Sequence, residues 1–111
     1  MLPAANRLRT AADFRDTTRR GAKAARGCVV VYLNRRPSQD APRVGVIVSK
    51  AVGGSVQRHR AARRIRHAVR PLLASVPTGA ILVVRALPGA DTDPALARDL
   101  SSGLGKVLAR S

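Results

Sequence analysis

The pattern of apolar and polar positions divides the chain into seven segments of regular structure. Apolar or alternating runs predict strands over residues 22–27, 28–33, 43–49 and 80–86. Helical spacing predicts helices over residues 11–20 and 56–73, and a third from residue 93 along a leucine stripe that ends at Leu108. The order is therefore α-β-β-β-α-β-α, which fits a single α+β domain with helices packed on one sheet.

Residues that favour helix ends support these boundaries. Thr10 with Asp13 has the form of a capping box at the start of the first helix, and Gly21 is expected to end it. Ser55 is predicted to cap the second helix and Asp93 the third.

The second predicted helix has one apolar face and one basic face. Ala61, Ile65 and Val69 fall on the apolar arc, and arginines fill the opposite arc. Arg58 falls within the apolar arc in the first turn, so it lies either at the rim of the core or across the sheet surface. The basic arc is either a solvated face or a nucleic acid contact. The second interpretation is favoured, because solvated faces usually mix charges of both signs.

Charge points to a polyanionic partner. The chain carries 21 Lys and Arg against 6 acidic residues, a formal net charge of +15, and has no acidic residue between residues 41 and 90. Release of counterions from a nucleic acid would offset the repulsion within such a protein. Arginine greatly outnumbers lysine, which favours bidentate phosphate contacts, although an arginine-rich genome composition would give the same bias.

The remaining chemistry is sparse. The single cysteine, Cys28, lies in an apolar run and is expected to be a small core residue. His59 and His67 have no acidic neighbours, which argues against a metal site and favours hydrogen bonds to phosphate or base. No catalytic set is recognisable, so any chemistry is expected to belong to a partner. The absence of a long apolar run and of a signal core predicts a soluble, cytoplasmic protein without membrane contact.

Two further features leave alternatives open. The turn at Gly53 and Gly54 before Ser55 is either a phosphate contact at a helix N-terminus or a plain turn and cap. Phe14, together with Tyr32, could stack single-stranded bases, or Phe14 could simply anchor the first helix to the sheet.

The motifs resemble the bacterial ribonuclease P protein family along nearly the whole chain. The matching segments are Asn6-Arg7-Leu8, Asp13-Phe14, RVGVIVSK from Arg43, the Gly53 turn and the arginine-rich helix. Arg58-His59-Arg60 stands where the family has an Arg-Asn-Arg signature, and VVRALPGA precedes the last helix. The resemblance implies a two-layer, ribosomal-protein-like α/β sandwich with a left-handed β-α-β crossover. It also implies one domain over residues 1–111, in which residues 1–9 form a flexible arm.

The resemblance also implies two binding surfaces. The surface for the catalytic RNA would comprise Lys50, Arg58, His59, Arg60, Arg63, Arg64 and Arg66. The cleft for the 5′ leader of precursor tRNA would comprise Phe14, Tyr32, Val46 and Val48. Further phosphate contacts are predicted at Arg7, Arg9, Gly53, Gly54 and Ser55. Thr18 and Val29 stand where the family often has aromatic residues, which weakens a stacking description of the cleft.

The function implied is that of an RNA-binding subunit that assists a ribozyme in removing the 5′ leader from precursor tRNA. The partners would be the catalytic RNA, in a one-to-one complex with a monomeric protein, and precursor tRNA. No cofactor is expected on the protein itself, Mg²⁺ is expected to act through the RNA, and metal positions cannot be assigned. The alternatives are a basic structural ribosomal protein and an enzyme that acts on nucleic acid by itself.

Overall fold

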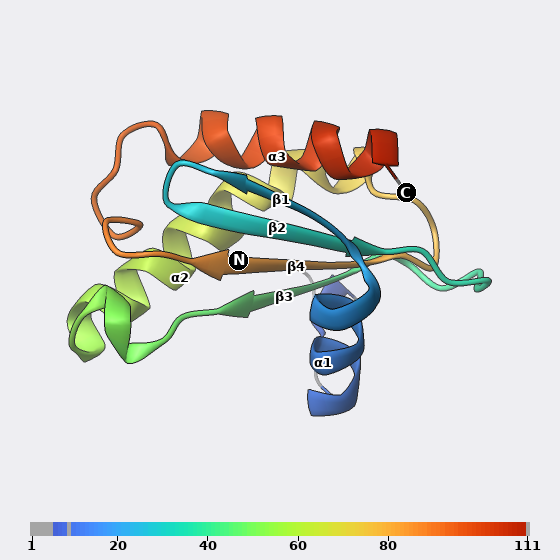
Figure 1. Ribbon diagram of the computed structural model, residues 1–111, viewed down its shortest axis with the longest axis horizontal. Helices are drawn as coiled ribbons and strands as arrows, with labels where there is room; N and C mark the ends of the chain where they lie inside the picture. Colours follow the sequence, from blue (N-terminus) through green and yellow to red (C-terminus); the bar gives the residue numbers. More distant parts are fainter. Residues whose placement is uncertain (1–5, 9, 111) are drawn as a thin grey trace.

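The computed structural model describes residues 6–8 and 10–110 and has the predicted order of elements (Figure 1). The helices are α1 (Ala11–Arg20), α2 (Ser55–Val69) and α3 (Leu96–Arg110). The strands are β1 (Ala22–Arg26), β2 (Val29–Asn34), β3 (Arg43–Ile47) and β4 (Ile81–Ala86). Two short 3₁₀ helices, η2 (Lys50–Val52) and η3 (Arg70–Ser75), flank α2. The predicted α+β class is confirmed.

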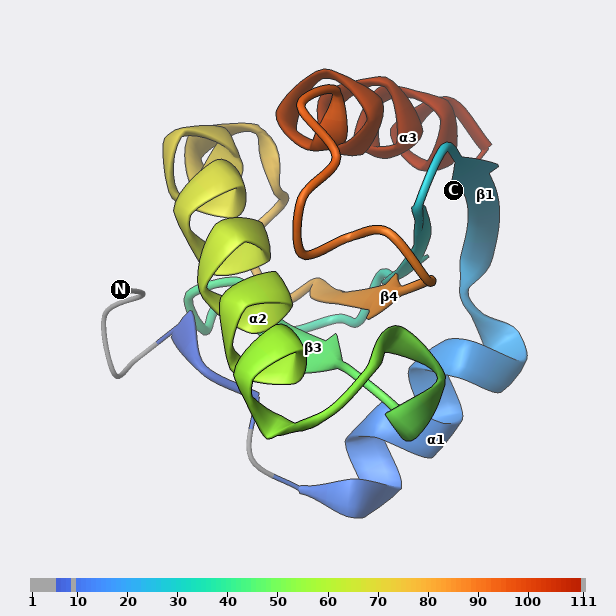
Figure 2. The same ribbon diagram turned by 90° about the vertical axis from the view of Figure 1, so that its left-hand side faces the viewer.

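The four strands form one sheet in the order β1-β2-β4-β3. Strand β2 pairs antiparallel with both β1 and β4, whereas β3 pairs parallel with β4 at the edge. Helix α2 connects these two parallel strands, and the crossover is left-handed (Figures 1 and 2). This rare hand was implied by the family resemblance, and the apolar pattern alone would have favoured the opposite one.

Helices cover the two faces of the sheet unequally. Helices α2 and α3 lie over one face, and α1 lies against one end of the other (Figure 2). The larger apolar cluster lies under α2 and α3 and contains fully buried residues such as Val31, Ile65 and Leu100. A smaller cluster on the α1 face joins Leu8, Val30, Tyr32, Ile81 and Val83, with Phe14 packed against it. Part of the α1 face therefore remains open.

No helix in the described part of the chain has the length and hydropathy to cross a membrane.

Most predicted boundaries are confirmed, and the cap of α2 is wrong. The backbone N–H of Asp13 donates to Oγ1 of Thr10 at 3.3 Å, and Gly21 ends α1. Gly54 occupies the N-cap position of α2, Ser55 is its first residue, and no side chain caps the helix. Helix α2 is shorter than predicted, because Pro71 has no N–H group and the chain continues from Arg70 as the 3₁₀ helix.

Cys28 lies in the tight turn between β1 and β2, beside Gly27 with φ of 55°, and not within the strand as predicted. Its burial is confirmed. Burial raises the pKa of the Cys28 thiol to about 11, and the neighbouring Asp93 carboxylate contributes. The helix that was predicted to start at Asp93 begins later, at Leu96, so Asp93 lies in the turn before α3. Its Oδ1 accepts the N–H of Ala95 at 2.9 Å, and this bond lowers the pKa of Asp93. Cys28 is thus a protonated core thiol at neutral pH.

Two glycines of α3 give a matched test of helix packing. A Cβ at Gly103 would lie 2.8 Å from Cγ2 of Val31, whereas one at Gly105 would meet nothing within 4 Å. Gly103→Ala should therefore lower the free energy of unfolding by about 1–3 kcal/mol, through overpacking against β2. Gly105→Ala should raise it by up to about 1 kcal/mol, through helix propensity alone. Urea unfolding measures both, and equal effects would contradict this packing.

Candidate RNA interface

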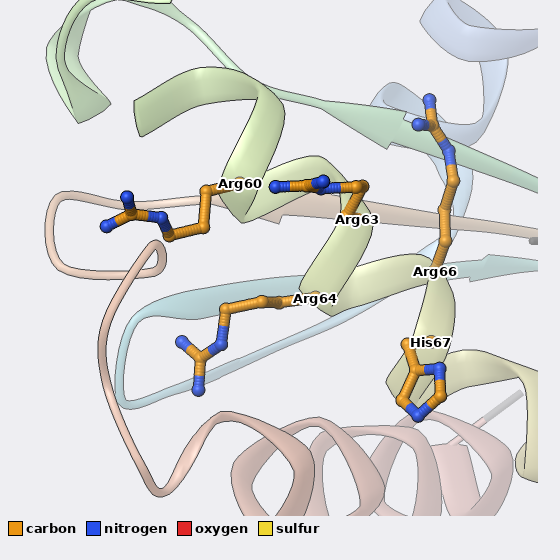
Figure 3. A pocket seen from close by; sticks show the side chains of 5 residues that line it. All are labelled: Arg60, Arg63, Arg64, Arg66 and His67. Atoms are coloured by element: carbon orange, nitrogen blue, oxygen red, sulfur yellow. The ribbon is translucent and has the colours of Figure 1, made fainter. Parts of the chain in front are cut away.

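Helix α2 presents its arginines to solvent because its apolar arc anchors it to the core. Ala61, Ile65 and Val69 are 0% exposed and face the sheet and α3, as the predicted arc requires. Arg60, Arg63 and most of the other basic side chains emerge from the opposite side of the helix (Figure 3). The burial of one arc therefore fixes the direction of the other.

The exposed arc borders a hollow of about 480 Å³ that is lined by Arg60, Arg63, Arg64, Arg66 and His67. Their side chains fan out along α2 and do not converge on one point (Figure 3). Within the described residues, ion pairs join Arg20 to Asp16 and Arg36 to Asp13, and none involves α2. Spread cations without acidic partners match a row of backbone phosphates better than one small anion.

Arg64 differs from its neighbours, because its guanidinium is bonded within the protein. Its Nη1 donates to the carbonyl of Ala90 at 2.8 Å, and its Nη2 donates to the carbonyl of Asp93 at 2.5 Å. These two bonds fasten the loop between β4 and α3 to α2. Sequence reasoning placed Arg64 with the RNA-facing residues. The structure gives it a positioning contact that the division of the helix into an apolar and a basic arc could not show.

This difference predicts opposite behaviour for adjacent arginines. Arg64→Ala should lower the free energy of unfolding by about 1.5–3 kcal/mol, because two carbonyls lose a charged donor. Arg63→Ala should change it by less than about 0.5 kcal/mol, because the side chain is exposed. Urea denaturation of the two variants makes the comparison. A smaller loss for Arg64→Ala than for Arg63→Ala would contradict the assignment.

The first turn of α2 brings together the predicted turn residues and Arg58. Lys50 is exposed in η2, Gly53 has φ of 144°, and the first turn of α2 contains no acidic residue. Arg58 is half-buried, and its Nε is buried without a hydrogen-bond partner among the described residues. This places Arg58 at the rim of the core. The phosphate contacts at Gly53, Gly54 and Ser55 remain predictions.

A second feature is a groove of about 230 Å³ at the edge strand β3. It is lined by Arg7, Leu8, Phe14, Val44, Gly45, Val46 and Arg66. The Phe14 ring lies directly over Gly45, where a Cβ would overlap the ring. Arg66 extends from α2 toward β3 and α1, away from His67 (Figure 3). The groove therefore joins the basic face of α2 to the apolar side of α1.

The predicted cleft residues are not all on one face. Phe14 and Tyr32 belong to the α1 face, whereas Val46 and Val48 pack against the cluster under α2 and α3. Gly45 faces the Phe14 ring, so alternation along β3 puts its neighbour Val46 on the opposite face. Val46 still lines the groove because β3 is an edge strand, but Val48 is not among the lining residues. The structure therefore does not place Val48 in a cleft with Phe14.

Part of the predicted arm is attached to the sheet edge. The N–H of Leu8 donates to the carbonyl of Val44 at 2.9 Å, and Nδ2 of Asn6 donates to the carbonyl of Pro42 at 2.7 Å. Arg7 forms a parallel bridge with Val44 and lines the groove. Arg9 and residues 1–5 lie outside the described residues.

Sequence reasoning missed two cations beside Tyr32. Lys23 Nζ and Arg85 Cζ each lie 5.9 Å from the centroid of the Tyr32 ring. A signal was available, because Arg85 is the one charged residue of an apolar strand and must face outward. No group of three potential metal-ligating side chains occurs within residues 6–8 and 10–110.

Comparison with known proteins identifies close relatives. The family model for ribonuclease P matches residues 2–108. The ribonuclease P protein component of Streptomyces bikiniensis is 48% identical over 118 residues, covering 97% of this chain and 96% of the relative. That of Mycolicibacterium paratuberculosis is 44% identical, covering 100% of this chain and 98% of the relative. The Staphylococcus aureus RNase P protein structure superimposes with a TM-score of 0.72 at 27% identity, covering 96% of this chain and 94% of the other.

Proposed function

The chain belongs to the ribonuclease P protein family, and from this membership we propose that it uses two distinct surfaces for two different RNAs. As a ribonuclease P protein component, it binds the RNA subunit and assists removal of the 5′ leader from precursor tRNA. The matches reported above give no support to a structural ribosomal protein. The division of labour between surfaces is the proposal.

The first surface is the exposed arc of α2, which we assign to the RNA subunit. Its supporting observation is a set of exposed cations without acidic partners on a helix whose other face is buried. Such an arc follows a phosphate backbone and reads little sequence. Arg60, Arg63 and Arg66 carry this contact, with Lys50, Arg58 and His59 beside them, while Arg64 fastens the β4–α3 loop to α2.

The second surface is the groove at β3, which we assign to the single-stranded leader. A half-buried aromatic ring over a glycine lies beside two cations, Arg7 and Arg66. A single strand is held by such a combination, because bases contact the ring while phosphates contact the cations. Arg66 borders both surfaces, so it is the residue at which the two RNAs would come closest.

The chemistry of cleavage is assigned to the RNA subunit, with Mg²⁺ acting there. The one thiol is buried with a pKa near 11, and the two histidines lie on the basic arc without acidic partners. No general base with an orienting carboxylate is formed by these groups. The protein is expected to act as a monomer in a one-to-one complex with the RNA.

Reconstitution tests this function. Precursor tRNA should be cleaved at low magnesium only when the cognate RNA subunit and this protein are both present, and the protein free of RNA should cleave nothing. Cleavage equally fast without the protein would contradict an assisting role. Cleavage by the protein alone would instead make it an enzyme in its own right.

A further inference from the structure

Tyr32 is the aromatic residue expected to stack leader bases, but two cations cover it. In the sheet register Lys23 on β1 lies directly opposite Tyr32, and Arg85 on β4 lies diagonally across from it on the same face. Both side chains are exposed, and both lie 5.9 Å from the ring centroid, whereas Tyr32 is only 5% exposed. What reaches solvent at this point is positive charge and not an aromatic face.

This charge has no partner within the described residues. Neither Lys23 nor Arg85 takes part in an ion pair there. The acidic residues of α1, which lies on the same face, are already engaged: Asp13 with Arg36, and Asp16 with Arg20 and Asn34. Two adjacent uncompensated cations favour an anionic ligand.

The pair also lies in line with the groove at β3. Lys23, Tyr32, Val83 and Gly45 are paired in register across the four strands, and Phe14 lies over Gly45 at the far end. Three strand spacings separate the two ends, or roughly 14 Å. A single strand lying across the open half of this face would contact an aromatic ring first and the two cations next.

We propose that Lys23 and Arg85 bind backbone phosphates of the 5′ leader and thereby extend the leader site beyond the groove, with Tyr32 as their apolar support. This inference rests on the assignment of the groove to the leader. It replaces stacking on Tyr32 with phosphate contacts, which are independent of leader sequence. Leader affinity in this protein is therefore predicted to depend on salt more than on the identity of the bases beside Tyr32.

The test measures affinity of the reconstituted holoenzyme for a non-cleavable precursor tRNA and for mature tRNA, across a salt series. The double variant Lys23→Ala/Arg85→Ala should lower affinity for the precursor by about tenfold. The slope of log affinity for the precursor against log salt concentration should fall in magnitude by about 1.4, because each phosphate contact on a single strand contributes roughly 0.7. Affinity for mature tRNA should not change. Lys23→Arg/Arg85→Lys should keep the wild-type slope.

Two controls separate this inference from its alternatives. Arg98→Ala/Lys106→Ala removes two exposed cations from α3, on the other face, and should leave the precursor's slope unchanged. Equal losses for precursor and mature tRNA, or a loss of RNA subunit binding, would overturn the inference. If Phe14→Ala abolishes the preference for the precursor and the double variant does not, only the inference fails. If neither variant affects that preference, the assignment of the groove to the leader is wrong as well.

Discussion

Replacing Arg60 and Arg63 together with alanine should weaken binding to the RNA subunit by about 10- to 100-fold near physiological salt. Both side chains are exposed on the arc of α2 that lies away from the core. Each is expected to neutralise one phosphate, so the slope of log affinity against log salt should fall by roughly two units. Filter binding over a salt series gives both quantities.

The matched control removes the same charge elsewhere. Arg98→Ala/Lys106→Ala lowers the net charge by two as well, and should reduce RNA subunit affinity only through the weaker overall field. If both double variants lose affinity and slope equally, net charge and not the α2 surface carries the binding. Thermal unfolding of each variant should be unchanged, because none of the four side chains is buried.

Gly45→Ala should disrupt the leader groove, because a Cβ at this position overlaps the Phe14 ring. Displacement of the ring should reduce the preference of the holoenzyme for precursor over mature tRNA by about tenfold, the scale of one lost base–aromatic stack. The free energy of unfolding should fall by about 1–3 kcal/mol through overpacking. Affinity for the RNA subunit should stay within about twofold, because the α2 arc is not altered.

A double-mutant cycle makes this prediction specific. Phe14→Ala alone should also remove the preference for precursor tRNA, and it makes room for a Cβ at position 45. Gly45→Ala should therefore cost less in the Phe14→Ala background, with a coupling of about 1–2 kcal/mol in stability. If the losses in the free energy of unfolding are additive, contact with the Phe14 ring is not what requires a glycine at position 45.

Sequence patterns predicted the elements well because local rules govern them. Alternation and β-branched runs predicted the strands. The helical spacing of α2 correctly assigned Ile65 to the buried arc and Arg63 to the exposed arc. The misplaced ends have local causes too. Ser55 has the chemistry of a cap, but Gly54 takes the extended conformation that the N-cap requires.

Other features depend on tertiary structure and were beyond the pattern. The hand of the β3-α2-β4 crossover came from the family resemblance alone. Arg64 and Arg63 are neighbours of the same type, and only the position of the β4–α3 loop distinguishes a bonded guanidinium from an exposed one. Val48 was grouped with Phe14, but Val48 follows the end of β3 and packs with the cluster under α2 and α3, whereas Phe14 packs on the other face of the sheet. The sequence indicated that Arg85 faces outward, but only the strand register placed Lys23 and Arg85 beside Tyr32.

The central claim is that two surfaces of one small protein contact two different RNAs, and site-specific cross-linking tests it most directly. Cys28 does not interfere with a thiol-reactive probe, because it is buried and its pKa is near 11. Val56→Cys on α2 and Ala11→Cys on α1 each introduce one exposed attachment point. In the holoenzyme bound to precursor tRNA, the probe at residue 56 should cross-link to the RNA subunit and the probe at residue 11 to the leader. Cross-links from both positions to the same RNA would contradict the two-surface account.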